Sequence, residues 1–308
     1  MIIMPQRAIF QELILKIEGT LNILEDKSEE NTYNTLRALW QTASGNRVSA
    51  ITANNLALPF LASIQHTFLE ELIKSRLSGV PLAHLTERQH FMGLDYILNK
   101  GHYIPRKETE LLAGTTIELL LNDYAANETV KVIDLCSGIG TIALAIAWYC
   151  KNTQVFGSDI YLPAVVAAEI NAKQFGLEKS ASFFHADMFD PFEQLNLKNK
   201  VDIIVSAPPY ITSVKVSQMA KEISDHEPME AFDAGPFGLS IFNKLISIAP
   251  EYLCNNGYLL FECGLGQGEF LAKRLSSNNN YGEVTTICDD HGNIRVLKAQ
   301  KISKNNKE

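Results

Sequence analysis

The chain reads TVKVIDLCSGIGTIALAIA over residues 129–147, a pattern from which its expected architecture follows. Residues 130–135 are rich in β-branched side chains and favour a strand, whereas the Ala, Leu and Ile of residues 141–147 favour a buried helix. Between them, Gly138 and Gly140 let the backbone pass close to a ligand, and the start of the helix offers free N–H groups. The stretch therefore predicts a ligand-binding strand, turn and helix of an α/β fold.

Two further strands are predicted to follow, each with an acid near its end. VFGSDI, at residues 155–160, leads to Asp159 about twenty residues beyond the glycine turn, where a carboxylate can accept both hydroxyls of a ribose. SFFHADMF, at residues 182–189, leads to Asp187, which we expect to accept an adenine amino group while Met188 packs on the ring. Acids recurring at strand–helix–strand spacing indicate a nucleotide site.

A fourth strand is predicted in VDIIVSAPPY, residues 201–210. Its apolar, β-branched centre indicates a buried strand, and Pro208 and Pro209 end it because neither residue has an N–H to donate to a sheet. Two fixed φ angles hold the preceding carbonyl groups, and Tyr210 supplies one wall of a slot for a flat group. Because open α/β sheets bind ligands at the carboxyl ends of their strands, this loop is the candidate acceptor site.

The composition is that of an ordinary globular protein, with 46% of the 308 residues hydrophobic and 20% charged. The longest apolar run, residues 142–150, is too short to cross a bilayer, and residues 1–10 lack the features of a signal peptide, so we expect a cytoplasmic protein without membrane contact. The five cysteines form no CxxC pair and indicate free thiols, and no metal site is expected. The net charge of −8 disfavours binding to free nucleic acid.

The rest of the chain predicts two domains joined by a linker. Residues 1–83 show helical periodicity, which favours a small helical bundle that either packs its own core or docks a substrate. Residues 84–104 predict a β-hairpin linker, and residues 105–300 a doubly wound α/β domain with a mostly parallel sheet and a terminal strand pair. Residues 301–308 are expected to be a frayed tail.

Taken together, these residues resemble the HemK/PrmC family of protein-glutamine N5-methyltransferases. The motifs that carry the resemblance are Ile104-Pro105-Arg106-x-Glu108-Thr109-Glu110, Asp134 to Gly140, Asp159, Pro208-Pro209-Tyr210, Glu227-Pro228 and Gly235-x-x-Gly238-Leu239. The resemblance implies a class I (Rossmann-like) S-adenosylmethionine methyltransferase domain behind a substrate-docking helical domain. It also implies a protein substrate, the glutamine of the Gly-Gly-Gln motif of peptide chain release factors, or in a sister branch a ribosomal-protein glutamine.

The resemblance also assigns roles to individual residues. It places the acceptor on Ala207, Pro208, Pro209 and Tyr210. It places S-adenosylmethionine on Asp134, Cys136, Ser137, Gly138, Ile139, Gly140, Asp159, Asp187, Met188 and Ala207.

Two positions depart from the family pattern. Cys136 stands where the family usually has glycine, although the ribosomal-protein branch also has cysteine there. Ala207 stands where the family has asparagine, whose side-chain oxygen, with a proline carbonyl, accepts the two hydrogens of the substrate amide. Catalysis of this kind depends on placement and fixed dipoles, so losing one such group should lower the rate roughly 10²–10³-fold if nothing compensates.

Three interpretations of Ala207 stay open. The residue is an engineered change that traps substrate, or it marks a divergent enzyme acting on an amine or hydroxyl of a small molecule, or Ser206 or Thr212 supplies the missing oxygen. A protein that binds cofactor and partner without turnover is the non-enzymatic alternative. Adenine methylation of nucleic acid is disfavoured by the acidic balance. His226, beside Glu227-Pro228, is a candidate base, although a loop histidine in such a setting is more often structural.

Overall fold

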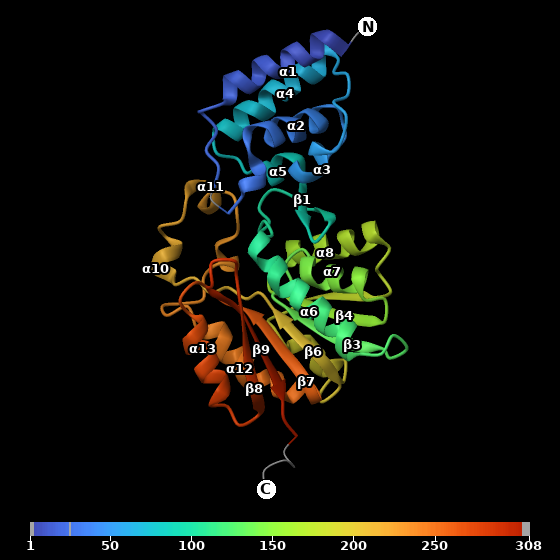
Figure 1. Cartoon of the computed structure of the whole chain (residues 1–308), viewed down its shortest axis with the longest axis vertical. Coiled ribbons are helices and arrows are strands. Elements are labelled where there is room, and N and C mark those ends of the chain that lie inside the picture. The colour runs from blue at the N-terminus through green and yellow to red at the C-terminus, as the bar shows by residue number, and fades with distance from the viewer. Residues whose placement is uncertain (1–2, 25, 304–308) are drawn as a thin grey trace. The chain divides into compact units, whose positions relative to one another are not determined.

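The computed structural model describes residues 3–24 and 26–303, so residues 304–308 of the tail expected to fray lie outside the described part. The chain forms two compact units (Figure 1). The helical unit comprises Met1–Lys107 and Met219–Pro228, and the sheet unit comprises Glu108–Gln218 and Met229–Glu308. Each unit is described below by itself.

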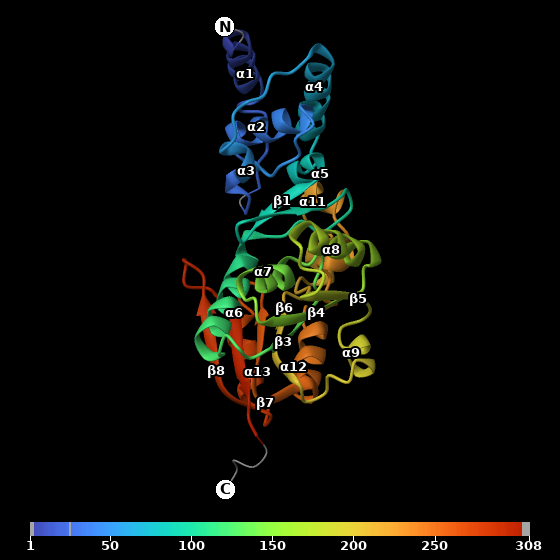
Figure 2. The same cartoon turned by 90° about the vertical axis from the view of Figure 1, so that its right-hand side faces the viewer.

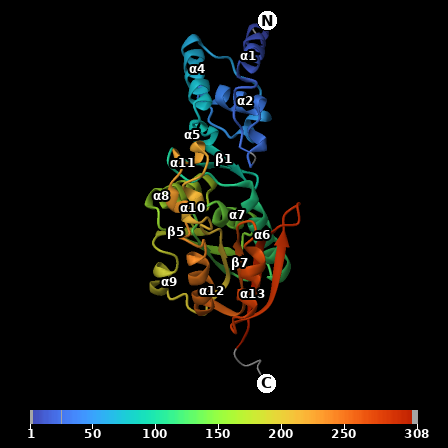
Figure 3. The same ribbon diagram turned by 90° about the vertical axis from the view of Figure 1, so that its left-hand side faces the viewer.

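The helical unit is built around α2, which contacts α1, α3, α4 and α5; Figure 3 shows α1, α2 and α4. Its helices are α1 (Ile3–Ile17), α2 (Thr32–Ala43), α3 (Ala50–Asn54), α4 (Ser63–Leu77) and α5 (Leu82–Thr86). Their apolar faces share one core that includes Phe10, Leu36 and the fully buried Trp40. A two-stranded antiparallel hairpin of β1 (Arg88–Phe91) and β2 (Leu94–Ile97) follows α5.

Segment 219–228, which carries α11 (Lys221–Ser224), belongs to the helical unit because buried charges tie it there. The Glu222 carboxylate lies 3.1 Å from the Arg76 guanidinium. The Glu227 carboxylate accepts hydrogen bonds from the Ile104 amide at 2.8 Å and from Arg106 at 2.7 Å. The sequence alone places this segment within the α/β domain at 105–300; the difference arises because its partners lie more than a hundred residues away.

The sheet unit contains a seven-stranded sheet in the order β5-β4-β3-β6-β7-β9-β8. Strands β5, β4, β3, β6 and β7 run parallel, and β9 and β8 add an antiparallel pair at one edge. The strands are β3 (Val130–Leu135), β4 (Thr153–Asp159), β5 (Ala181–His185), β6 (Val201–Ser206), β7 (Leu253–Glu262), β8 (Tyr281–Cys288) and β9 (Ile294–Lys301). The predicted class I methyltransferase fold, with its mostly parallel sheet and terminal strand pair, is confirmed.

Helices cover both faces of this sheet; Figure 2 shows α6 and α7 on one side of β3 and α12 on the other. The helices are α6 (Glu110–Asp123), α7 (Thr141–Tyr149), α8 (Leu162–Phe175), α9 (Asp190–Gln194), α10 (Ser213–Val216), α12 (Ser240–Tyr252) and α13 (Gly268–Ser276). The predicted third strand, 182–189, was too long: β5 ends at His185, so Asp187 and Met188 lie in the turn beyond it. Within the described residues, no helix is both long and apolar enough to span a membrane.

Replacing Arg76 with methionine should strongly destabilise the protein. Its guanidinium lies 3.3 Å from Glu30 and 3.1 Å from Glu222, and all three side chains are almost completely buried. Removing one partner of a buried ion pair leaves an uncompensated charge, so we expect Arg76→Met to lower the free energy of unfolding by about 3–5 kcal/mol.

The matched control is Arg47→Met. Arg47 pairs with Glu87 at the surface, and such a pair contributes less than about 1 kcal/mol. Urea unfolding of both variants measures the difference, and equal losses would show that the Arg76 cluster is not a stabilising element.

Candidate active site

The glycine turn and the Pro-Pro-Tyr loop leave the sheet next to each other. Strand β3 lies between β4 and β6 in the sheet. The chain runs from β3 outward through β4 and β5 and then crosses to β6 on the other side of β3. The position between the carboxyl ends of β3 and β6 is therefore the topological switch point of the sheet. Leu135, the last residue of β3, pairs with Ser206, the last residue of β6. Cys136 and Ala207 are therefore the first residues beyond two adjacent strand ends, and the two predicted halves of the site meet there.

Glycine is required at the two positions of the turn for different structural reasons. Both have positive φ angles, 54° at Gly138 and 85° at Gly140. A Cβ on Gly140 would lie only 2.8 Å from the Phe183 ring, so this position is closed by packing. A Cβ on Gly138 would meet no atom within 4 Å, so this position is open toward a ligand. Cys136 shares the left-handed conformation, with φ 59°.

The turn is also fixed by a residue that sequence reasoning missed. Asn171 of α8 is fully buried and donates a hydrogen bond from its side-chain amide to the Ile139 carbonyl at 3.1 Å. The Ile139 side chain is only 3% exposed, so this residue contributes its backbone rather than its side chain to the open side of the turn. Nothing in the sequence around Asn171 marks this contact.

Asp134 and Ser137 carry buried polar atoms that are not satisfied. Asp134 Oδ2 accepts the Ala143 amide at 3.0 Å, near the start of α7. Among the residues that the structure describes, Asp134 Oδ1 and Ser137 Oγ have no hydrogen-bond partner. Burial raises the pKa of Asp134 to about 8. Orphaned polar atoms of this kind, beside the open face of Gly138, fit a bound polar group such as S-adenosylmethionine.

Asp159 ends β4 and braces the same turn. One carboxylate oxygen accepts the Gly138 amide and the other accepts the Tyr161 amide, each at 2.8 Å. Burial raises the pKa of Asp159, while these two amide bonds lower it. The carboxylate is thus positioned at the edge of the glycine turn.

Asp187 and Met188 lie in the turn after β5. The Asp187 carboxylate is half exposed and lies 2.6 Å from the Lys244 ammonium of α12, an ion pair that the sequence did not predict. Met188 has a φ of 50°, and its carbonyl accepts the Ser158 hydroxyl at 2.6 Å. The Met188 side chain is only 4% exposed and packs in the core with Phe189.

In the acceptor loop, Ala207 is half-buried, Pro208 is buried, and Pro209 and Tyr210 are partly exposed. Of the two neighbours considered as replacement acceptors, Ser206 donates its hydroxyl hydrogen to the Leu135 carbonyl at 2.9 Å, and its side chain is fully buried, so its lone pairs do not face an open surface.

Thr212 is the other candidate acceptor. Its hydroxyl oxygen accepts the Lys215 amide at 3.5 Å and caps α10. A hydroxyl oxygen has two lone pairs, so Thr212 can still accept a second hydrogen, whereas the complete burial of Ser206 weakens the interpretation that it replaces the asparagine oxygen.

Two other sequence motifs meet in the helical unit instead. As described above, the Ile104-Pro105-Arg106 segment binds Glu227, whose side chain is fully buried. The adjacent His226 packs edge-to-face on His84, with ring centroids 6.5 Å apart. This arrangement favours the structural interpretation of His226 over a catalytic base.

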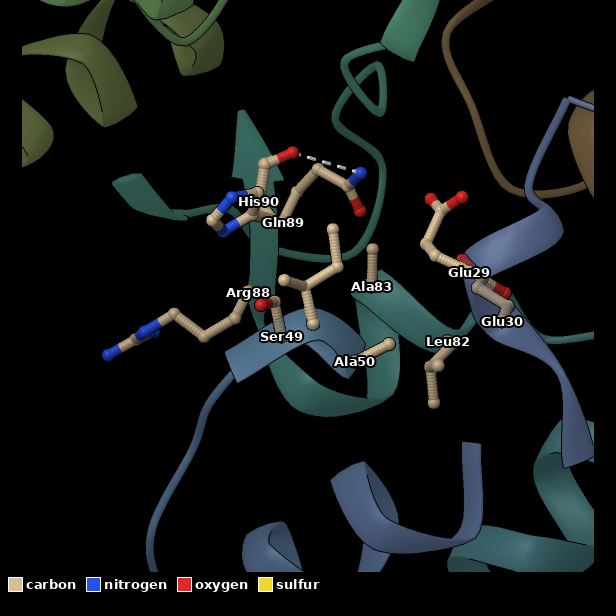
Figure 4. A pocket seen from close by; sticks show the side chains of 10 residues that line it. Glu29, Glu30, Ser49, Ala50, Leu82, Ala83, Arg88, Gln89 and His90 are labelled. Carbon is tan, nitrogen blue, oxygen red and sulfur yellow. Dashed lines mark hydrogen bonds between the residues drawn. The ribbon is translucent and has the colours of Figure 1, made fainter. Parts of the chain in front are cut away.

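The helical unit also contains a small polar pocket, shown in Figure 4 with lining residues that include Ser49 and His90. Asp95, which is close by, accepts the Ser49 hydroxyl at 2.7 Å and faces His90 Nδ1 at 3.1 Å. Because the serine donates to the carboxylate and not to the imidazole, the trio lacks the geometry that activates a serine nucleophile. We therefore assign no chemistry to this pocket.

Comparison with known proteins agrees with this arrangement. Residues 110–226 match the family model described as "Methyltransferase small domain". The chain is 32% identical over 244 residues to the release factor glutamine methyltransferase of Thermodesulfovibrio yellowstonii, covering 79% of this chain and 84% of that protein. It is 34% identical over 231 residues to the protein of the same name from Clostridium acetobutylicum, covering 74% of this chain and 78% of that protein.

Among solved structures, the protein-(glutamine-N5) methyltransferase of Alicyclobacillus acidocaldarius superposes with a TM-score of 0.40 at 22% identity, covering 65% of this chain and 95% of that one. The family assignment comes from the sequence relatives, which match most of both chains at 30% identity or more. The chain therefore belongs to the release factor glutamine methyltransferase family and is a methyltransferase.

Proposed function

We propose that this protein transfers a methyl group from S-adenosylmethionine to the side-chain amide of the glutamine in the Gly-Gly-Gln motif of a peptide chain release factor. The observation that carries the proposal is the pairing of Leu135 with Ser206, which brings the glycine turn and the Pro-Pro-Tyr loop together at the switch point. The names of the sequence relatives support the choice of a release factor.

The cofactor would lie along the open face of the glycine turn. Gly138 leaves room for it, and Asp159 accepts its ribose hydroxyls in place of, or beside, the amides that it now binds. Asp134 Oδ1 and Ser137 Oγ, unpartnered among the described residues, are available to its polar groups. Asp187 would accept the adenine amino group, which requires its carboxylate to bind the adenine and the Lys244 ammonium at the same time.

The bound cofactor supplies an electrophilic methyl group on a sulfonium. In such a transfer the glutamine nitrogen would gain the methyl group, the cofactor would leave as a neutral thioether, and the nitrogen would then lose one proton to water. An amide nitrogen is a poor nucleophile, so the protein's contribution is placement. The carbonyl groups held by Pro208 and Pro209 would accept an amide hydrogen, and Tyr210 would cover one face of the amide.

Ala207 makes this placement incomplete, because it has no side-chain oxygen and the neighbouring Ser206 hydroxyl is fully buried. These observations favour a second candidate function, methylation of an amine or hydroxyl of a small molecule, because a stronger nucleophile needs less help. The same scaffold and cofactor site would serve both reactions.

Methylation of a bacterial release factor tests the proposal directly. The factor is incubated with S-adenosylmethionine and either the protein as it stands or Ala207→Asn, and the Gly-Gly-Gln peptide is analysed by mass spectrometry. We expect a methyl group on the glutamine with both proteins, and a rate roughly 10²–10³-fold higher with the asparagine variant. If neither protein methylates the factor, the acceptor is a different molecule.

Asp159→Ala should weaken binding of S-adenosylmethionine. Hydrogen bonds to a charged group contribute about 1.5–3 kcal/mol, so we expect the dissociation constant to rise about 10- to 100-fold in calorimetry. Asp202→Ala is a control in the same unit, because the Asp202 carboxylate binds the Lys131 amide at the opposite ends of the strands. Unchanged affinity in Asp159→Ala would remove the ribose assignment.

Asp134 should make stability depend on pH. Its pKa is raised to about 8 in the folded protein, against about 3.9 when unfolded, so the folded state binds more protons between these values. The stabilisation from its proton is complete below about pH 4 and is lost as pH rises toward 8. Urea unfolding from pH 5 to pH 8 should show a smaller loss of stability for Asp134→Asn than for the parent protein; equal losses would mean that Asp134 is already ionised.

A further inference from the structure

One side chain fastens three segments around the acceptor loop. Gln267, just before α13, donates from its amide nitrogen to the Tyr210 carbonyl at 3.0 Å and to the Gly238 carbonyl at 3.3 Å. Its amide oxygen accepts the Gly264 amide at 2.9 Å. The residue therefore joins the Pro-Pro-Tyr loop to the turn before α12 and to the turn after β7.

Two glycines let these segments approach Tyr210. A Cβ on Gly238 would lie 2.7 Å from the Tyr210 carbonyl oxygen, and a Cβ on Gly264 would lie 2.8 Å from Cδ2 of the tyrosine ring. Gly238 also has a positive φ of 66°. There is thus no room for a side chain at either glycine, and the backbone of these two segments packs directly against Tyr210.

A buried carboxylate lies at the end of the strand next to the acceptor loop. Glu262 is the last residue of β7 and is 3% exposed. The Arg295 guanidinium lies 3.6 Å away and offsets its charge. Because β7 is the neighbour of β6, Glu262 lies beside the strand end from which the acceptor loop departs.

We propose that Gln267 is a positioning residue for methyl transfer: with Gly238 and Gly264 it forms a clamp, here called the tyrosine clamp, that holds Tyr210 as a fixed wall of the acceptor slot. The proposal rests on the proposed function in one respect, that the Pro-Pro-Tyr loop receives the acceptor. The two prolines fix only their own φ angles, so Tyr210 needs another restraint. Since this reaction depends on placement, the clamp acts on the chemical step.

Gln267→Leu tests the clamp because it keeps the size of the side chain and removes all three hydrogen bonds. Displacing a positioning group by about 1 Å can cost about 10²-fold, so we expect kcat for methyl transfer to the release factor to fall by about that factor. The affinity for S-adenosylhomocysteine, measured by calorimetry, should not change. Gln194→Leu, at an exposed position on α9, is the matched control and should retain full kcat.

Amide hydrogen exchange of the full-length protein supplies a readout that needs no substrate. The Ile211 amide donates to the Phe232 carbonyl at 3.0 Å, so it reports on the loop next to Tyr210. Gln267→Leu should speed exchange in the peptide that contains Ile211, whereas Gln194→Leu should not. Gln267→Glu, which places a second oxygen against the Tyr210 and Gly238 carbonyl groups, should have the same effect if the leucine variant folds poorly.

The kinetic measurement and the hydrogen-exchange measurement together distinguish failure of the clamp from failure of the proposed function. Kinetics are measured with Ala207 and with Ala207→Asn. If either parent protein methylates the factor, unchanged kcat in the corresponding Gln267 variants overturns the clamp. If neither parent methylates it, the proposed substrate is wrong, and hydrogen exchange alone decides: faster exchange at Ile211 supports the clamp, and unchanged exchange overturns it.

Discussion

The parallel pairing of β3 with β6 is the constraint on which the rest of the site depends. Four residue pairs, from Val132–Ile203 to Leu135–Ser206, set the register of these strands. A slip of one residue would move the Pro-Pro-Tyr loop by about 3.3 Å relative to the glycine turn, which is more than a methyl transfer can tolerate. The buried, β-branched strand centres therefore do more than stabilise the sheet, because their register sets the distance between the two halves of the site.

The carboxylates at this end of the sheet share an unusual environment. Asp134, Asp159 and Glu262 lie at or near the ends of β3, β4 and β7, and burial raises the pKa of each. Folding alone would favour apolar residues or complete hydrogen bonding at such positions. Their placement at the ligand-binding edge, together with the open space over Gly138, is what a site arranged for a polar ligand requires.

Local sequence patterns were sufficient for the sheet, the glycine turn and the Pro-Pro-Tyr loop, because β-branched runs, glycine and proline act on their own backbone. They were insufficient for Asn171 and Gln267, whose partners are main-chain atoms distant in sequence. The same reason hid the attachment of segment 219–228 to the helical unit, which depends on pairing between Arg76 and Glu222. Side chains that bind remote carbonyl groups or remote charges leave no periodic signal in a single sequence.

A crystal structure of the protein with S-adenosylhomocysteine would test the central claim most directly, namely that the switch point between β3 and β6 is the catalytic centre. The account predicts that the ligand lies over Gly138, with its ribose hydroxyls on Asp159 and its sulfur directed toward Ala207 and the Pro-Pro-Tyr loop. A ligand bound elsewhere, or one whose sulfur faces away from that loop, would contradict the account.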